Sequence, residues 1–119
     1  MCIRDRFWYG IHPTEALFTV MGRGCESVVR TTTGSAIVVT GTWTGDRVGT
    51  LHGITDGKRG YKVIAFGSKA IAEQKSGGDY TPMLREIMQF FRTGTPPVPN
   101  EVTLEILSLI HISEPTRPY

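Results

Sequence analysis

The segment His12-Pro13-Thr14-Glu15 holds the residues best suited to chemistry. An imidazole exchanges protons near neutral pH, which suits His12 to general acid–base catalysis. Pro13 restricts the backbone of the preceding residue to extended conformations, so we expect His12 to be held just before a helix. Glu15 follows one turn on, where it could orient the ring or bind a substrate hydroxyl. The alternative is structural: His12 caps the helix and Glu15 complements the helix dipole.

The other potential ligands and nucleophiles are scattered. Cys25, His12 and His52 lack the spacing of metal ligands. Nothing near Cys25 in the sequence would lower its pKa, so we do not expect a nucleophile there. His52 lies within a β-rich run, and we expect it to be half-buried in a sheet. Residues 22–27 are a near miss to a dinucleotide-binding fingerprint, but they lack its third glycine and precede a strand, so we expect a helix end.

Local patterns predict the elements that position these residues. Pro13 begins a short helix over residues 13–21, and glycines end it. Alternating or β-branched residues separated by turn signals predict strands over 25–33, 36–44, 47–54, 61–66 and 71–74. Such short connections favour an antiparallel meander of four or five strands.

Two further helices complete the prediction. Thr81-Pro82 caps a helix with an apolar stripe that ends at Gly94. Asn100 caps another, which includes residues 101–106. The fold class is therefore α+β, with helices packed on one face of the sheet. The other face carries Thr31, Thr33, Thr40 and Thr42, or their alternates, and needs water or a partner.

Composition excludes several classes of protein. The chain has 119 residues, enough for one domain, with 39% apolar and 20% charged residues. A net charge of +2 is too small for a nucleic-acid-binding surface. No apolar run approaches the ~20 residues of a membrane-spanning helix. Cys2 and Cys25 are too few for a disulfide scaffold.

Both ends read as translated sequencing adapter. Residues 1–6 back-translate to a transposase mosaic end, and residues 107–117 back-translate to its reverse complement with the adjoining adapter. We therefore expect residues 1–6 and 107–119 to be artefacts that pack poorly, and residues 7–106 to be a gene fragment. Excluding them removes three of 13 basic and two of 11 acidic residues, which lowers the net charge from +2 to +1.

Residues 9–22, Tyr-Gly-Ile-His-Pro-Thr-Glu-Ala-Leu-Phe-Thr-Val-Met-Gly, resemble the segment around the active-site histidine of the Gfo/Idh/MocA family, the relatives of glucose–fructose oxidoreductase and inositol dehydrogenase. Further segments agree in order and extend the resemblance over nearly all of residues 7–106, as the second half of a longer enzyme. These supporting segments are 38–43, 48–50, 60–61, 66–67, 80–91, 93–98 and 101–106.

The resemblance implies a function for this segment. In the family, a Rossmann domain binds NAD or NADP, and the C-terminal domain supplies the histidine that moves the alcohol proton. His12 matches that histidine and Gly10 the glycine two residues before it, while Glu15 stands where aspartate is frequent. Trp8 replaces the aspartate that many members carry four residues before the histidine. By resemblance, His12 is catalytic, and Trp8, Tyr9 and Glu15 bind substrate.

The resulting expectation is the catalytic-histidine half of an NAD(P)-dependent oxidoreductase acting on a sugar, inositol or related hydroxyl compound. The fragment lacks the Rossmann domain, so alone it should bind no cofactor or metal and be inactive. We expect a homo-oligomer formed through the open sheet face, no nucleic-acid or membrane partner, and a cytoplasmic location, although the sequence does not fix the compartment. The alternative is a non-catalytic sheet domain serving oligomerisation or ligand binding, which the Trp8 departure would suit.

Overall fold

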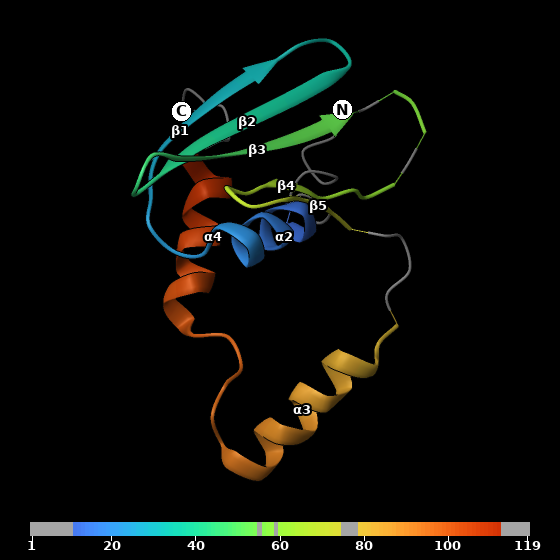
Figure 1. Cartoon of the computed structure of the whole chain (residues 1–119), viewed down its shortest axis with the longest axis vertical. Helices are drawn as coiled ribbons and strands as arrows, with labels where there is room; N and C mark the ends of the chain where they lie inside the picture. The colour runs from blue at the N-terminus through green and yellow to red at the C-terminus, as the bar shows by residue number, and fades with distance from the viewer. Residues whose placement is uncertain (1–10, 55, 59, 75–78, 113–119) are drawn as a thin grey trace, which may run out of the picture.

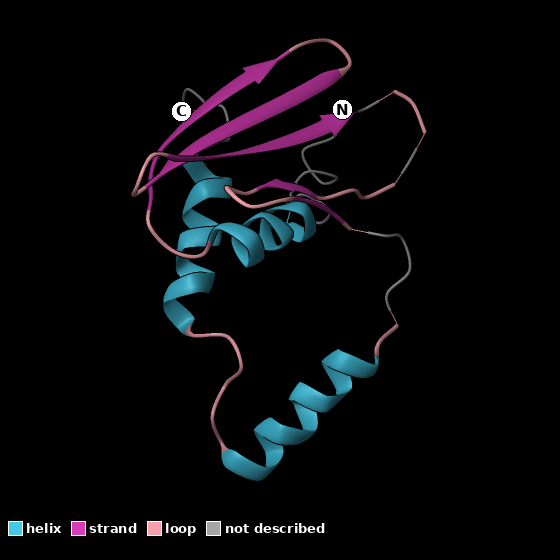
Figure 2. Ribbon diagram, in the orientation of Figure 1, coloured by secondary structure: helices cyan, strands magenta, loops and turns pink. Residues whose placement is uncertain are grey.

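The computed structural model describes residues 11–54, 56–58, 60–74 and 79–112, and within them three helices and five strands form an α+β fold (Figures 1 and 2). The predicted fold class is confirmed. The elements are, in chain order, α2 (Ile11–Met21), β1 (Cys25–Thr32), β2 (Ala36–Trp43), β3 (Arg47–Ile54), β4 (Ile64–Phe66), β5 (Ile71–Glu73), α3 (Thr81–Thr93) and α4 (Asn100–Ile112).

The strands form two antiparallel sheets. The larger is the meander β1-β2-β3, and its strand limits agree with the predicted runs to within one residue. The smaller is the hairpin β4-β5, whose strands are shorter than predicted and pair only with each other among the described residues. The five predicted strands are therefore all present, with the sequential pairing interrupted between β3 and β4.

Tight turns set the limits of the meander. The Thr33 amide donates to the Ala36 carbonyl at 2.8 Å and closes the β1–β2 connection. Between β2 and β3, Gly45 and Asp46 have φ values of 75° and 55°, in the left-handed region that short hairpin connections use. These local turn signals explain why the strand limits were predictable from the sequence.

Helices α2 and α4 pack beneath one face of the large sheet (Figure 1). The alternation along β2 places Val39, Gly41 and Trp43 toward the helices, where all three are buried. The opposite face is open and carries Thr31, Thr40 and Thr42, as expected. His52 lies on this open face and is exposed, so its predicted half-burial is wrong. No described helix covers that face.

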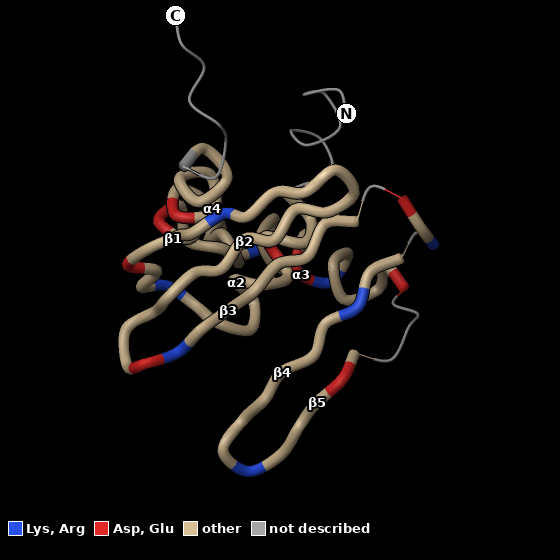
Figure 3. Tube along the Cα trace, turned by 90° about the horizontal axis from the view of Figure 1, so that it is seen from above, with Lys and Arg blue, Asp and Glu red and all other residues tan. Residues whose placement is uncertain are grey.

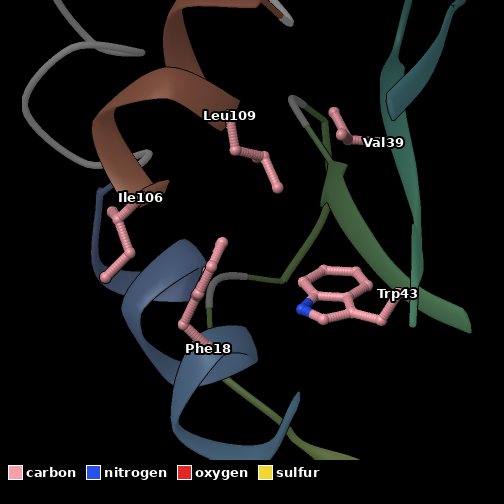
Figure 4. Packing of buried hydrophobic residues seen from close by; sticks show 5 residues of the cluster. All are labelled: Phe18, Val39, Trp43, Ile106 and Leu109. Atoms are coloured by element: carbon pink, nitrogen blue, oxygen red, sulfur yellow. The ribbon is translucent and has the colours of Figure 1, made fainter. Parts of the chain in front are cut away.

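The core is small and centres on Trp43, which is 2% exposed (Figure 4). Its ring meets Phe18 of α2 edge-on, with centroids 5.5 Å apart and an interplanar angle of 66°. Its indole Nε1 donates to the Gly22 carbonyl at 2.9 Å, so the one polar atom of the ring is satisfied. The buried cluster is completed by Val39, Ile106 and Leu109.

Two glycines make room for this indole. Gly41 and Gly49 are directly paired between β2 and β3. A Cβ at Gly41 would lie 2.5 Å from Cζ3 of Trp43, and one at Gly49 would lie 2.8 Å from Cδ1 of Leu17 and 3.1 Å from Cζ3 of Trp43. The absence of side chains at this pair therefore creates the recess into which α2 and Trp43 pack.

Gly49→Ala should consequently destabilise the fold by about 1–3 kcal/mol, the usual scale for overpacking a filled core. Gly53→Ala is the matched control on the same strand and the same sheet face, because its Cβ would meet nothing closer than 3.8 Å. Urea denaturation measures both. Equal decreases in the free energy of unfolding for the two variants would contradict the assignment of Gly49 to a filled recess.

Helix α4 runs further than predicted and takes part in the core. It extends to Ile112, and Leu109 is 4% exposed while Ile110 packs against the cluster. The expectation that residues 107–119 pack poorly is therefore wrong for these two. The reason is periodicity: Leu109 and Ile110 lie three and four residues after Ile106, on the same helix face.

Leu109→Ala should lower the free energy of unfolding by about 2–5 kcal/mol, as for other buried leucines. Leu107→Ala removes the same atoms from a residue that is 46% exposed on the same helix and should cost about 1 kcal/mol or less. Thermal or urea unfolding compares the two. Equal, small effects would place α4 outside the cooperative unit.

Helix α3 lies apart from both sheets (Figures 1 and 2). Its predicted apolar stripe forms but is not buried. Gly94 ends the helix in the left-handed conformation, with its amide donating to the Phe90 carbonyl at 2.7 Å, as predicted. The N-cap is Tyr80 rather than the predicted Thr81, and the Thr81 amide donates to Oδ1 of Asp79 at 3.0 Å.

Candidate functional site

The first turn of α2 carries the candidate histidine. The helix begins at Ile11, so His12 has helical backbone and does not precede the helix. The prediction that Pro13 holds it extended is wrong. Pro13 is in the first turn, where its missing amide has no intrahelical partner, and the packing of α2 on the sheet outweighs the local preference.

The opposite face of α2 anchors this turn. Thr14 and Phe18 are 2% and 3% exposed, and Phe18 packs on Trp43 in the core. Residues on the other face point to solvent: the side chains of His12 and Glu15 are 62% and 53% exposed. The pair is thus carried on a helix whose position is fixed by buried contacts rather than on a loop.

His12 and Glu15 approach each other across one helical turn. Nδ1 of His12 lies 3.5 Å from Oε2 of Glu15. A carboxylate at this distance can orient the ring through Nδ1, which leaves Nε2 for an external partner. The arrangement can therefore accept a proton from a bound hydroxyl and stabilise the resulting charge.

The structure bears on the alternative in which His12 caps the helix and Glu15 complements the helix dipole. An N-cap residue has non-helical backbone outside the first turn, whereas His12 is the second residue of α2. Glu15 lies beyond the first turn of the helix, where the dipole effect is strongest. The predicted substrate contacts Trp8 and Tyr9, and the matching Gly10, lie outside the described residues.

The predicted helix end at Gly22 and Gly24 is confirmed, with φ values of 69° and 100°. The Gly24 amide donates to Oε2 of Glu105 at 3.0 Å, and Nε of Arg23 lies 3.2 Å from Oε1 of the same carboxylate. The Glu105 carboxylate thus binds both residues that follow the end of α2. Sequence reasoning missed Glu105, because its partners lie 81 and 82 residues away along the chain.

These contacts also shift the titration of Glu105. The Gly24 amide and then the Arg23 guanidinium stabilise the carboxylate and lower the pKa of Glu105, while partial burial opposes them. A perturbed carboxyl is a common mark of a functional site. Here both oxygens are used to join α4 to the α2–β1 connection, so the shift has a structural cause.

The remaining candidates for chemistry are Cys25 and a possible group of metal ligands. Burial and then the nearby Glu105 carboxylate raise the pKa of the Cys25 thiol, which makes it a poor nucleophile, as expected. Within the described part of the chain, no group of three or more histidine, cysteine, aspartate or glutamate side chains is arranged to hold a metal ion.

Glu105→Gln should make stability less dependent on pH in acid. Because the folded pKa of Glu105 is below the ordinary value of 4.5, its contribution is present above that value and is lost as pH falls through the folded pKa. The free energy of unfolding of the wild type should therefore fall more steeply than that of the variant below about pH 4.5. Chemical denaturation between pH 3 and 6 measures this, with Glu86→Gln, an exposed glutamate of α3, as control.

Comparisons with protein-family models, curated proteins and solved structures found no match for this chain. The family resemblance therefore remains a hypothesis based on the residues themselves. No described helix combines the length and apolar character needed to cross a bilayer.

Proposed function

We propose that this chain is the substrate-binding, catalytic-histidine half of an NAD(P)-dependent oxidoreductase that acts on a sugar, inositol or related hydroxyl compound. The observation that carries the proposal is the exposed His12–Glu15 pair on the first turns of α2, a helix whose other face is buried. Effective acid–base catalysis needs a proton-transfer group held in a fixed direction, and a buried helix face supplies that.

His12 would act as the base in alcohol oxidation. As the hydroxyl-bearing carbon is oxidised, the O–H proton passes to the free ring nitrogen of His12 and leaves an imidazolium. The Glu15 carboxylate, 3.5 Å from Nδ1, offsets this positive charge and keeps the ring oriented. In the reverse direction, the same imidazolium returns the proton to the carbonyl oxygen. Trp8 and Tyr9, which precede the helix, would contact the substrate.

We place the binding of NAD or NADP outside the described residues. The one glycine pair at a helix end has its Gly24 amide bonded to Glu105, and it precedes a strand rather than following one. The proposal therefore assigns cofactor binding to a separate domain. The exposure of His12 agrees with this division, because the reacting groups would meet at a surface shared by the two domains.

A second candidate is a non-catalytic domain that forms homo-oligomers through the open sheet face. The observation that favours it is the exposure of three branched apolar residues there: Val29, Val48 and Ile54 are 65%, 60% and 71% exposed. Threonines between them give the face the mixed character of a protein interface. The two proposals are compatible, because an oligomeric enzyme could use this face for assembly and the opposite layer for catalysis.

In the full-length enzyme, His12→Ala should lower turnover by about 10²–10⁴-fold, the usual effect of losing a general acid–base group. Glu15→Gln should have a smaller effect, because it supports the ring without taking the proton. Stability should change by about 1 kcal/mol or less, since His12 is exposed. Steady-state kinetics and thermal unfolding measure the two effects.

His52→Ala is the matched control, an exposed histidine on the opposite side of the sheet. It should leave turnover unchanged. Full turnover in His12→Ala would contradict the catalytic assignment and leave assembly as the function of this domain.

A further inference from the structure

The outer edge of β3 has no strand partner among the described residues. β3 pairs with β2 along its entire length, without a register shift, and β2 pairs on its other side with β1. The backbone groups of β3 that point away from β2 are therefore available for another strand. Such an edge favours pairing with any extended segment that can reach it.

The other edge of the sheet is protected. β1 has a register irregularity between Cys25 and Ser27 and carries Glu26 and Arg30. Bulges, charges and covering helices are the usual means of preventing further strand addition. β3 pairs with β2 without such an irregularity over its eight residues, and its only Lys, Arg, Asp or Glu is Arg47 at the start.

The β4–β5 hairpin lies beside this unprotected edge. Figure 3 shows it on the β3 side of the large sheet, and Figure 1 shows it below the level of β3. Each strand has three residues; Nζ of Lys62 lies 2.6 Å from Oε1 of Glu73, and the Gln74 amide donates to the Val63 carbonyl at 2.9 Å. An isolated two-stranded hairpin is marginally stable in water, so this one also lacks a partner.

We propose that the β4–β5 hairpin closes on the outer edge of β3, with β4 as the added antiparallel strand, to give a five-stranded meander. Residues 55–63 connect the two strands and are long enough to return the chain along β3. A pairing symmetric about this connection opposes Ile54 with Ile64, Gly53 with Ala65, and His52 with Phe66.

The burial pattern of β4 agrees with this register. Directly opposed residues share a sheet face, so Ala65 joins Gly53 on the helix-covered face. Ala65 is the partly buried residue of β4, whereas Ile64 and Phe66 are 45% and 79% exposed. A shift by one residue would reverse these faces.

Closure would also give the sheet a protected edge. β5 would become the outer strand, and it has only three residues, follows Lys69 and ends at Glu73. A short edge strand with charged residues resists further pairing. The hairpin therefore carries the protective features that β3 lacks.

Amide hydrogen exchange of the full chain, followed residue by residue by NMR, tests the proposal. Alternate amides of β3 point to β2 and should exchange slowly in either case. If the hairpin closes, the outward-pointing amides should also exchange at least about tenfold more slowly than in an unstructured peptide. If the outward-pointing amides of the wild type exchange at the rate of an unstructured peptide, this measurement overturns the proposal by itself.

Ala65→Pro identifies what protects the outward amides, because proline removes a donor from the middle of β4. The outward amides should lose their protection in this variant, while the amides directed to β2 keep theirs and report an intact fold. Lys58→Pro, outside the paired residues, is the control and should leave both sets protected. Outward protection that survives Ala65→Pro overturns the proposal, and a dependence on protein concentration would then identify a second copy of the chain as the partner.

Discussion

The seating of Trp43 is the contact on which the rest of the structure depends. Its indole fills the recess left by the paired Gly41 and Gly49, and its edge-on contact with Phe18 fixes α2 beneath the sheet. Its single donor reaches the Gly22 carbonyl and so also fixes the end of that helix. One side chain thereby sets the distance, direction and end point of the helix that carries the candidate site.

The orientation of His12 follows from this contact. Phe18 is buried because it faces Trp43, and His12 and Glu15 lie on the other side of the same helix. The link between Glu105 and Gly24 adds a second attachment, between α4 and the residues that follow α2. The candidate site is therefore exposed and yet held by buried contacts, which is the condition that a proton-transfer group at a domain surface would need.

Much of the fold could be predicted because its signals are local. The left-handed Gly45 and Asp46 and the short turn after Thr33 set strand limits that sequence reasoning found. The proximity of His12 and Glu15 likewise follows from helical periodicity. The contacts that could not be predicted are those that join distant segments or depend on which face is covered. Glu105 reaches Gly24 across 81 residues, and His52 is exposed on a face that no helix of the described residues covers.

Helix α4 contains residues that were expected to pack poorly but that helical periodicity brings into the core. The packing of a side chain depends on its shape and polarity and not on the origin of the segment that carries it. Leu109 and Ile110 continue the apolar helix face that includes Ile106, and this spacing is sufficient to place them against the core.

The edge of β3 differs from the exposed apolar faces of α3 and the open sheet in the kind of partner that would stabilise it. The buried cluster has five residues, while the six apolar residues of α3 and three of the open sheet face are at least 40% exposed. An edge such as that of β3 needs hydrogen bonds, which a short hairpin can supply. A broad apolar face instead needs area, which a three-residue strand cannot provide. If the chain is half of an oxidoreductase, α3 and the open face are therefore the surfaces through which a second domain or subunit would complete the core, and α2 can present His12 without contributing to either.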